Sequence, residues 1–520
     1  MEEDEDLLTS SKRTRSARPW RCGVLLALLA LALVAASFLL QGDIGINLTD
    51  EGYLWYGASA ILRGQVPLRD FQSYDPGRYY WVAAWFRALG DHGIIPLRIA
   101  CAAFNVLGVW CGLLVLRRLS RAWYFLVPSG ALLTLCAFPA FMLNYVFALA
   151  AVYFALLVLE SPSAPRHFAA GAFVGVTAFF MRNFGAFAFI SLAAIMLLTR
   201  QTLSREERRR RELVFGAGIA VGYTPALFMF VALPGFWQAN VDIVRLLGEI
   251  GATNLTKPVP WPWEQSSFWD VCVGLLFLLD AVFYVLAIGW MVVLGRTACL
   301  RRPVFVAATV AGIPFLHYAF SRADVEHLAM TIHPLLIAIL ALPFEGPRKW
   351  RTPAVGLALG VTAVCVLTFG AVNPWYQRFA AAPGWYVRAP VGGWNLWLPR
   401  FDAELIAGAV RFNANVVRPD EGFLIVPQAG PGLYAILNRE SPLAMTLFGL
   451  RHPEWRQKAM IEDLERKHVN WILFEDKAID GSEERRFRVT HRLIWEYMVK
   501  EFEMVPEGLP GNFHLLRRKK

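Results

Sequence analysis

Charged residues are scarce in this sequence. Asp, Glu, Lys and Arg together make up 18% of the 520 residues, whereas about a quarter is usual in a soluble globular protein. Hydrophobic residues make up 56%, and the mean hydropathy is +0.42. This balance excludes an ordinary soluble enzyme and predicts a protein built largely within a membrane.

Cysteine is also rare, and its placement excludes disulfide-rich and zinc-binding architectures. The seven cysteines lie in or beside apolar runs, and none follows position 365. The chain therefore has no disulfide framework and no zinc-ligand spacing. Lys and Arg outnumber Asp and Glu by 51 to 41, but these cations stand in short clusters between apolar runs. That pattern is typical of membrane loops, so we expect membrane lipids and no nucleic acid as partners.

The apolar runs predict a polytopic α-helical membrane protein with about eleven transmembrane helices. The run 168–198 is interrupted at Arg182, which favours two half-length helices that meet near the outer side. The first run is long and has no obvious cleavage site, so we expect an uncleaved span and no signal peptide. The predicted spans are 22–40, 94–116, 123–138, 144–159, the two parts of 168–198, 213–233, 269–294, 304–320, 329–344 and 354–372.

The basic clusters all fall on one side of this arrangement. Because Lys and Arg accumulate in cytoplasmic loops, that side is expected to be the inside. The tail 1–21 is then cytoplasmic, and 22–372 forms the membrane domain with a first outer loop at 42–93. This topology places the C-terminus outside the cytoplasm. In a bacterial cell, the protein would lie in the plasma or inner membrane.

Residues 373–520 have the composition of a soluble domain. Two segments, 422–428 and 471–476, read as buried strands, and NFHLL near the end reads as a further strand. Helical segments are expected at 430–440, 454–468 and 483–502. This β-α-β order predicts a small extracytoplasmic α/β domain.

The stretch 50–81 carries the densest set of ionisable residues outside the basic clusters. Apolar residues at helical spacing predict an amphipathic helix over Asp50–Arg63, with Thr49 or Asp50 as its N-cap. Its two leading acids, Asp50 and Glu51, suit the positive end of a helix. Two interpretations stay open, an interfacial anchor or a catalytic acid held at the membrane–water boundary.

Four sets of ionisable side chains converge on the outer face in this topology. An ionisable residue at membrane depth is expensive, so each set is a functional hypothesis. Acids beside fixed cations suit a transfer reaction, because an acid can act as the base for an acceptor and the cations can stabilise an anionic leaving group. The alternative is that they pair with one another as structural salt bridges, or that Arg182 reaches lipid headgroups. The sets are Asp50 with Glu51, Asp75 with Arg78, Arg182, and Arg322 with Asp324, Glu326 and His327.

Several motifs resemble GT-C-fold membrane glycosyltransferases, the class of protein O-mannosyltransferases and the lipid A aminoarabinose transferase. These motifs are the Asp-Glu that opens the first outer loop, LRGQVPLRDF (62–71), YDPGRYYW (74–81), the interruption at Arg182 and SRADVEHL (321–328). The likeness extends over essentially the whole chain. The sequence departs from the family pattern at Pro76-Gly77, where relatives often have Pro-Pro, and at Asn144, where they often have Asp.

The resemblance implies a role for individual residues. Asp50 corresponds to the general base, with Glu51 in support, and Asp75 to the acid of the second loop element. Asn144 replaces an acid and cannot act as a base or a charged metal ligand, so a divalent metal is possible but not supported, and no other cofactor is implied. The residues expected to bind the donor phosphate are Arg182, Arg322 and His327. Those expected to bind substrate are Arg78, Asn144 and Asp324.

The implied activity is transfer of a sugar from a polyprenyl-phosphate donor to a glycan, lipid or protein acceptor outside the cytoplasm. The enzyme would be a hexosyl- or pentosyltransferase. A single displacement at the anomeric carbon would invert the configuration of that carbon. A transporter or flippase of lipid-linked glycans is one alternative, but no paired internal repeats are found. A non-catalytic protein of the same fold is the other, but it would be expected to lack the outer acids Asp50 and Glu51.

Overall fold

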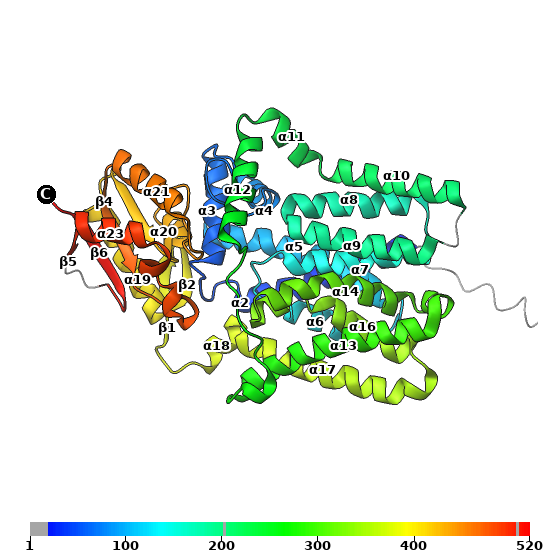
Figure 1. Ribbon diagram of the computed structural model, residues 1–520. Helices are drawn as coiled ribbons and strands as arrows, with labels where there is room; N and C mark the ends of the chain where they lie inside the picture. Colours follow the sequence, from blue (N-terminus) through cyan, green and yellow to red (C-terminus); the bar gives the residue numbers. More distant parts are fainter. Residues whose placement is uncertain (1–18, 201–203, 506–508) are drawn as a thin grey trace, which may run out of the picture.

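The computed structural model describes residues 19–200, 204–505 and 509–520. A bundle of long helices forms one end of the molecule, and a small domain containing two sheets forms the other (Figure 1). The predicted cytoplasmic tail lies mostly outside the described residues. Apolar helices long enough to cross a bilayer show that the protein is an integral membrane protein.

The bundle has a helix at each predicted span. Within the described residues, six helices are long and apolar enough to cross a membrane, or seven if α10 and α11, bent by 55°, form one span. The total of eleven therefore stays a prediction. The bundle helices are α2 (Pro19–Gln41), α5 (Ile94–Leu116), α6 (Trp123–Leu135), α7 (Asn144–Glu160), α8 (Ala164–Phe180), α9 (Arg182–Thr199), α10 (Arg205–Gly222), α11 (Thr224–Ala232), α13 (Phe268–Leu300), α14 (Pro303–Ser321), α16 (His333–Glu345) and α17 (Arg351–Val372).

The run 168–198 is divided into two helices, as predicted, but these helices are not half-length. Met181 has an extended backbone (φ −160°, ψ 98°) and separates α8 from α9. These helices have 17 and 18 residues, so each is about 25 Å long at 1.5 Å per residue. The two helices pack against each other as a hairpin. The turn at Met181 places Arg182 at the start of α9.

The C-terminal domain combines a hairpin with a four-stranded mixed sheet. In the sheet, β3 (Gly422–Val426) pairs parallel with β4 (Val469–Glu475), while β6 (Phe513–Arg518) pairs antiparallel with both β4 and β5 (Phe502–Val505). The hairpin and the helices of the domain are α18 (Pro374–Ala380), β1 (Tyr386–Val391), β2 (Trp394–Pro399), α19 (Arg400–Asn415), α20 (Gly430–Ile436), α21 (Glu454–Arg466), α22 (Phe487–Thr490) and α23 (Arg492–Glu501).

The predicted strands at 422–428, 471–476 and NFHLL correspond to β3, β4 and β6, and the expected helix at 483–502 is divided into 3-10 and α-helical segments that include α22 and α23. The hairpin β1–β2 was not predicted. Its turn, Gly392-Gly393, has positive φ at both positions, which is a strong short-range hairpin signal.

Four shorter helices lie at the end of the bundle that faces the C-terminal domain: α3 (Asp50–Leu62), α4 (Gly77–Leu89), α12 (Phe236–Ile250) and α15 (Val325–Ala329). Figure 1 shows α3 and α12 between the two parts, running across the direction of the bundle helices.

The predicted helix over Asp50–Arg63 is present as α3, but its expected amphipathic character, with one polar face in solvent, is wrong. Every side chain from Glu51 to Ile61 is buried. α4 covers one side of the helix, and α20 of the C-terminal domain covers another. The approach to α20 is so close that a Cβ added to Gly52 would lie 2.4 Å from the backbone nitrogen of Gly432. The helix is therefore an internal element between the bundle and the C-terminal domain.

Candidate functional site

The predicted site residues gather at the helix ends that face the C-terminal domain. Asp50 opens α3, Arg78 lies in the first turn of α4, Arg182 begins α9 and His327 lies in α15. Asn144 begins α7, and Arg322 and Asp324 lie between α14 and α15. The structure therefore brings together groups that are up to 277 positions apart in the sequence.

Asp50 is held by a local turn, but its carboxylate is unpaired. The Asn47 side chain accepts hydrogen bonds from the backbone N–H groups of Thr49 and Asp50, at 3.0 and 2.8 Å. Thr49 occupies the N-cap position, as predicted, but its side chain makes no capping hydrogen bond, and Asn47 binds these N–H groups instead. No hydrogen bond or ion pair joins the Asp50 carboxylate to a described residue. Burial raises the pKa of Asp50 above its ordinary value, opposed by the nearby His327 and Arg322 side chains.

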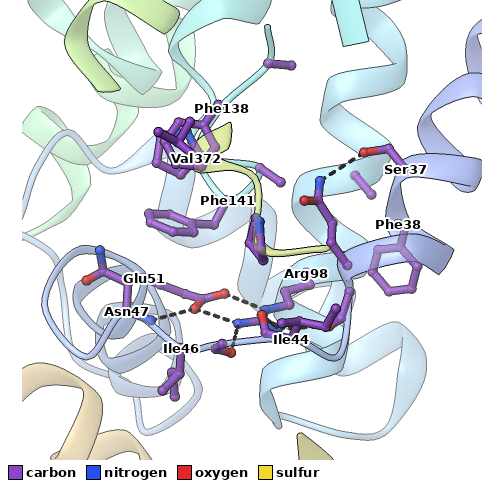
Figure 2. A pocket seen from close by; sticks show the side chains of 18 of the residues that line it. Ser37, Phe38, Ile44, Ile46, Asn47, Glu51, Arg98, Phe138, Phe141 and Val372 are labelled. Atoms are coloured by element: carbon purple, nitrogen blue, oxygen red, sulfur yellow. Dashed lines mark hydrogen bonds and ion pairs between the residues drawn. The ribbon is translucent and has the colours of Figure 1, made fainter. Parts of the chain in front are cut away.

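Glu51, next in the chain, is locked in a buried ion pair. Its side chain is 1% exposed, and its two oxygens accept from Nε and Nη2 of Arg98 at 2.7 and 2.9 Å (Figure 2). Arg98 also donates to the backbone carbonyls of Gly42 and Gly45, which fixes the loop before α3. The charge of Glu51 is thus satisfied inside the protein. Through Arg98, Glu51 therefore positions the loop before α3.

Asp75 and Arg182 are paired with each other. The Asp75 carboxylate accepts from Arg182 Nε at 2.5 Å and from the Arg182 backbone N–H at 2.8 Å. The second bond satisfies an N–H group at the start of α9, which is the function of a helix cap. Nearly half of the Arg182 side chain stays exposed.

Arg322 is fully engaged with carboxylates. It donates to both oxygens of Asp480, at 2.8 Å each, and its Nε donates to Asp324 at 2.9 Å. Asp480 belongs to the C-terminal domain and also accepts from Lys257 and Arg485. We call this cluster of Lys257, Arg322, Asp480 and Arg485 the interdomain clamp. It joins the loops at this end of the bundle to the C-terminal domain.

His327 is oriented by Asp324 and Asn254. Its Nδ1 lies 2.8 Å from Asp324 Oδ1, so Nδ1 carries the proton. Asn254 uses its own oxygen to accept from the Leu255 N–H, which leaves its NH₂ group facing His327 Nε2 at 3.1 Å. Nε2 therefore accepts from the Asn254 amide. Burial raises the pKa of Asp324, but the hydrogen bonds from His327 and the charges of His327 and Arg322 together outweigh burial and lower this pKa to about 2.

Tyr318 connects Asn144 to this group. Asn144 Nδ2 donates to the Tyr318 hydroxyl at 3.1 Å, and the Tyr318 ring stacks on His327 with centroids 5.0 Å apart. The Asn144 oxygen is buried and accepts no hydrogen bond from a described residue. Tyr318 lies at the end of α14 and carries no sequence signal that marks it as a site residue.

Arg78 is the least satisfied cation of the set. It is 9% exposed, and its guanidinium carbon lies 4.6 Å from the centre of the Tyr74 ring. Its buried Nε has no hydrogen-bond partner. No ion pair or hydrogen bond joins its side chain to any described residue.

Glu326 is a site residue to which the sequence analysis gave no role of its own. It is half-buried, and no described side chain pairs with it. Burial and the negative charges of Asp50 and Asp324 raise its pKa to about 7. A carboxyl group that titrates near neutrality beside an unpaired acid is a frequent feature of active sites.

A cavity of about 470 Å³ opens beside Glu326. One part of its wall is apolar and comes from helices of the bundle, including Val34, Val109 and Val372. The polar part includes Glu51 and Arg98, whose ion pair closes one side (Figure 2). Its position between membrane helices and outer loops suits a molecule with an apolar tail and a polar head. Among the described residues, no group of three or more His, Cys, Asp or Glu side chains is placed to hold a metal ion.

No family model and no curated protein matches the chain. A search of solved structures finds ArnT from Cupriavidus metallidurans, bound to undecaprenyl phosphate, with 12% sequence identity and a TM-score of 0.51 over 96% of this chain and 98% of that chain. The Archaeoglobus fulgidus oligosaccharyltransferase, in complex with zinc and sulfate, aligns more weakly, with 11% identity and a TM-score of 0.41 over 87% of this chain and 67% of that chain. The chain thus shares the GT-C fold of ArnT along nearly its full length, as the sequence motifs predicted.

Proposed function

We propose that the protein is a membrane glycosyltransferase that moves a sugar from a polyprenyl-phosphate carrier to an acceptor outside the cytoplasm. The observation that carries this proposal is an unpaired carboxylate, Asp50, in the same electrostatic neighbourhood as an unpaired cation, Arg78. Opposite charges left without partners are costly to a folded protein and useful to a reaction that separates charge. The fold shared with ArnT, which was solved with undecaprenyl phosphate, supports a lipid-phosphate donor.

Asp50 is the base in this proposal. It removes the proton from the acceptor hydroxyl as that oxygen attacks the anomeric carbon of the sugar. The bond from this carbon to the phosphate oxygen breaks, and its electron pair leaves with the lipid phosphate. A single displacement of this kind inverts the anomeric configuration. The raised pKa of Asp50 makes it a stronger base than an exposed carboxylate.

The other acids are less suited to this role, because their charge is already neutralised. Glu51 is paired with Arg98, and Asp75 with Arg182. The roles predicted for Arg182, Arg322 and His327 at the donor phosphate stay predictions. Each of these arginines would share its charge between a carboxylate and the donor, and His327 would contribute a hydrogen bond.

The basic clusters support a site on the outer face of the membrane. Nucleotide sugars are made in the cytoplasm, so an enzyme with its site on the outer face needs a donor that crosses the membrane with its lipid. The cavity beside Glu326, with apolar walls and a polar end, is the candidate place for the lipid-borne substrate.

The test replaces Asp50 by Asn in the purified full-length protein. Asn has nearly the same shape but cannot take the proton, so sugar transfer should fall at least a hundredfold, the lower range of general-base catalysis. Transfer from synthetic polyprenyl-phosphate sugars is measured together with thermal unfolding, which should change little.

Asp43→Asn is the matched control, because Asp43 lies in the same loop but pairs with the exposed Arg388. Its transfer rate should equal that of the wild-type protein. Wild-type activity in a well-folded Asp50→Asn protein would rule out Asp50 as the base. A wild-type protein that moves lipid-linked glycan across vesicles without transferring sugar would favour a flippase.

A further inference from the structure

The guanidinium of Arg78 is a buried cation without a partner. Arg98, Arg182 and Arg322 each have a carboxylate within 3 Å. Arg78 has none within 4 Å among the described residues, although more than nine-tenths of it is shielded from solvent. Buried charges in proteins are normally paired, because removing a charge from water without compensation is strongly unfavourable. A ligand with the opposite charge would supply the missing partner.

Besides the Asp50 carboxylate, the groups near Arg78 include two tyrosine hydroxyls that can donate a hydrogen bond. The Tyr79 hydroxyl accepts from the Tyr74 backbone N–H at 3.0 Å, and the Tyr318 hydroxyl accepts from Asn144. Each hydroxyl therefore keeps its own proton free to donate. The charge of Arg78 acts on both of these tyrosines. Free O–H and N–H donors around one cation are complementary to an anion with several oxygen atoms.

The local backbone also favours an anion at this place. Arg78 lies in the first turn of α4, a helix of 13 residues with no acidic residue in that turn. The positive end of the helix dipole adds to the guanidinium charge. Asp75, the nearest acid in the sequence, is turned away into its ion pair with Arg182. The face of the guanidinium that meets Tyr74 is covered, so a ligand would meet its edge, where the N–H groups point.

We propose that Arg78 is the principal binding residue for a phosphate oxyanion, which under the proposed function is the phosphate of the lipid-linked donor. This inference rests on the proposed function for the identity of the ligand. It assigns the phosphate to the first turn of α4, whereas the sequence motifs predicted Arg182, Arg322 and His327 as its ligands. Those two arginines already share their charge with Asp75 and Asp480.

The assignment gives Arg78 a defined part in the transfer. The donor phosphate carries one negative charge while it is bonded to the sugar. It gains a second when the bond to the anomeric carbon breaks and the electron pair stays on its oxygen. A fixed guanidinium beside that oxygen stabilises the added charge, and the acceptor proton moves to Asp50.

The experiment measures binding by the full-length protein in detergent. The probes are undecaprenyl phosphate, inorganic phosphate and the uncharged alcohol undecaprenol. The variants are Arg78→Gln, Arg78→Lys, Arg182→Gln and Arg63→Gln. Arg63 is the matched control, because it also lies over a tyrosine ring, Tyr56 at 5.6 Å, but has its own carboxylate partner in Glu440.

We expect Arg78→Gln to weaken binding of undecaprenyl phosphate roughly ten- to a hundredfold, which corresponds to the loss of charge-assisted hydrogen bonds. Arg78→Lys should retain part of the affinity, since it keeps the charge but not the planar fork. Arg63→Gln should bind as the wild-type protein does, and undecaprenol binding should be the same in every variant. Thermal unfolding without ligand provides a second readout. Removing an unpaired buried charge should leave the melting temperature unchanged or raise it, whereas removing a structural contact should lower it.

Three outcomes are decisive. Equal undecaprenyl phosphate binding by wild type and Arg78→Gln would overturn the assignment, and so would a larger loss in Arg182→Gln. If only inorganic phosphate binds and Arg78→Gln loses it, the anion site stands and the lipid-linked donor is rejected. If undecaprenyl phosphate binding depends on Arg78 but no sugar is transferred, the binding site stands and the transferase proposal fails.

Discussion

Asp50 and Glu51 are neighbours in the chain, yet their carboxylates have opposite surroundings. Glu51 is buried against Arg98 and holds the loop before α3 in place. Asp50 has no such partner among the described residues, and its carboxylate stays available to a substrate in the proposed reaction. On a helix, adjacent residues point about 100° apart, so one step along the chain separates a structural acid from a candidate catalytic acid.

Glu326 provides a prediction about pH at the residue scale. Its pKa of about 7 means that it is neutral below pH 7 and negatively charged above. The added negative charge should repel an anionic donor, so kcat/KM for the donor should fall above roughly pH 7. The acid limb of the profile should follow Asp50 instead, since protonation removes the base. In Glu326→Gln, the alkaline limb should vanish and the acid limb should stay.

The measurement is kcat/KM for the donor over roughly pH 5 to 9. The sugar phosphodiester does not itself titrate in this range, so a change of slope reports the protein. An alkaline limb of unchanged position in Glu326→Gln would assign that limb to another group.

At the scale of elements, the closest helix contact in the bundle is made by glycine. Gly171 and Gly175 of α8 face Gly218 and Gly222 of α10, four residues apart on each helix. A Cβ at Gly171 would lie 2.1 Å from the carbonyl oxygen of Phe215, and one at Gly222 would lie 2.1 Å from that of Ala172. Small residues at this spacing allow helix backbones to touch, which stabilises helix pairs in a membrane.

We predict that Gly222→Ala destabilises the protein by about 1–3 kcal/mol, because the new methyl group forces the two backbones apart. Gly216→Ala on the same helix is the control, since nothing lies within 4 Å of its added Cβ. Thermal unfolding in detergent should show a lower melting temperature for the first variant alone. Equal melting temperatures for both variants would contradict the packing argument.

At the scale of the whole molecule, the bundle and the C-terminal domain share one hydrophobic core. Trp55 of α3 and Tyr79 of α4 belong to the same buried cluster as Leu396 and Tyr434 of the C-terminal domain. The interdomain clamp adds ion pairs at this junction. The C-terminal domain therefore helps to position His327 and Asp324 opposite Asp50.

Membrane orientation can be tested by reporter fusion. A reporter placed after Lys520 should be active only outside the cytoplasm, and one inserted near Arg209 only inside, because the strongest basic cluster lies there. Enzymatic reporters that need an oxidising or a reducing compartment distinguish the two sides. The reverse pattern would place the candidate site on the cytoplasmic face and remove the reason for a lipid-linked donor.

The sequence by itself determined the membrane class, the positions of the bundle helices and the presence of a C-terminal domain with strands. Such features are local, because an apolar segment in a bilayer must satisfy its own backbone hydrogen bonds and does so as a helix. The sequence also located the group of outer residues that contains Asp50 and Arg78. It did not show that α3 is buried, since the residues that cover it follow some 370 positions later.

Only the tertiary structure decided which charges are paired. Glu51 meets Arg98, Asp75 meets Arg182, and Arg322 meets Asp480, and each partner comes from a different segment of the chain. An ion pair forms over a few ångströms, so its partners depend on how distant helices pack and not on spacing along the sequence. The same packing left Asp50, Arg78 and Glu326 without partners among the described residues, and these three groups carry the proposed chemistry.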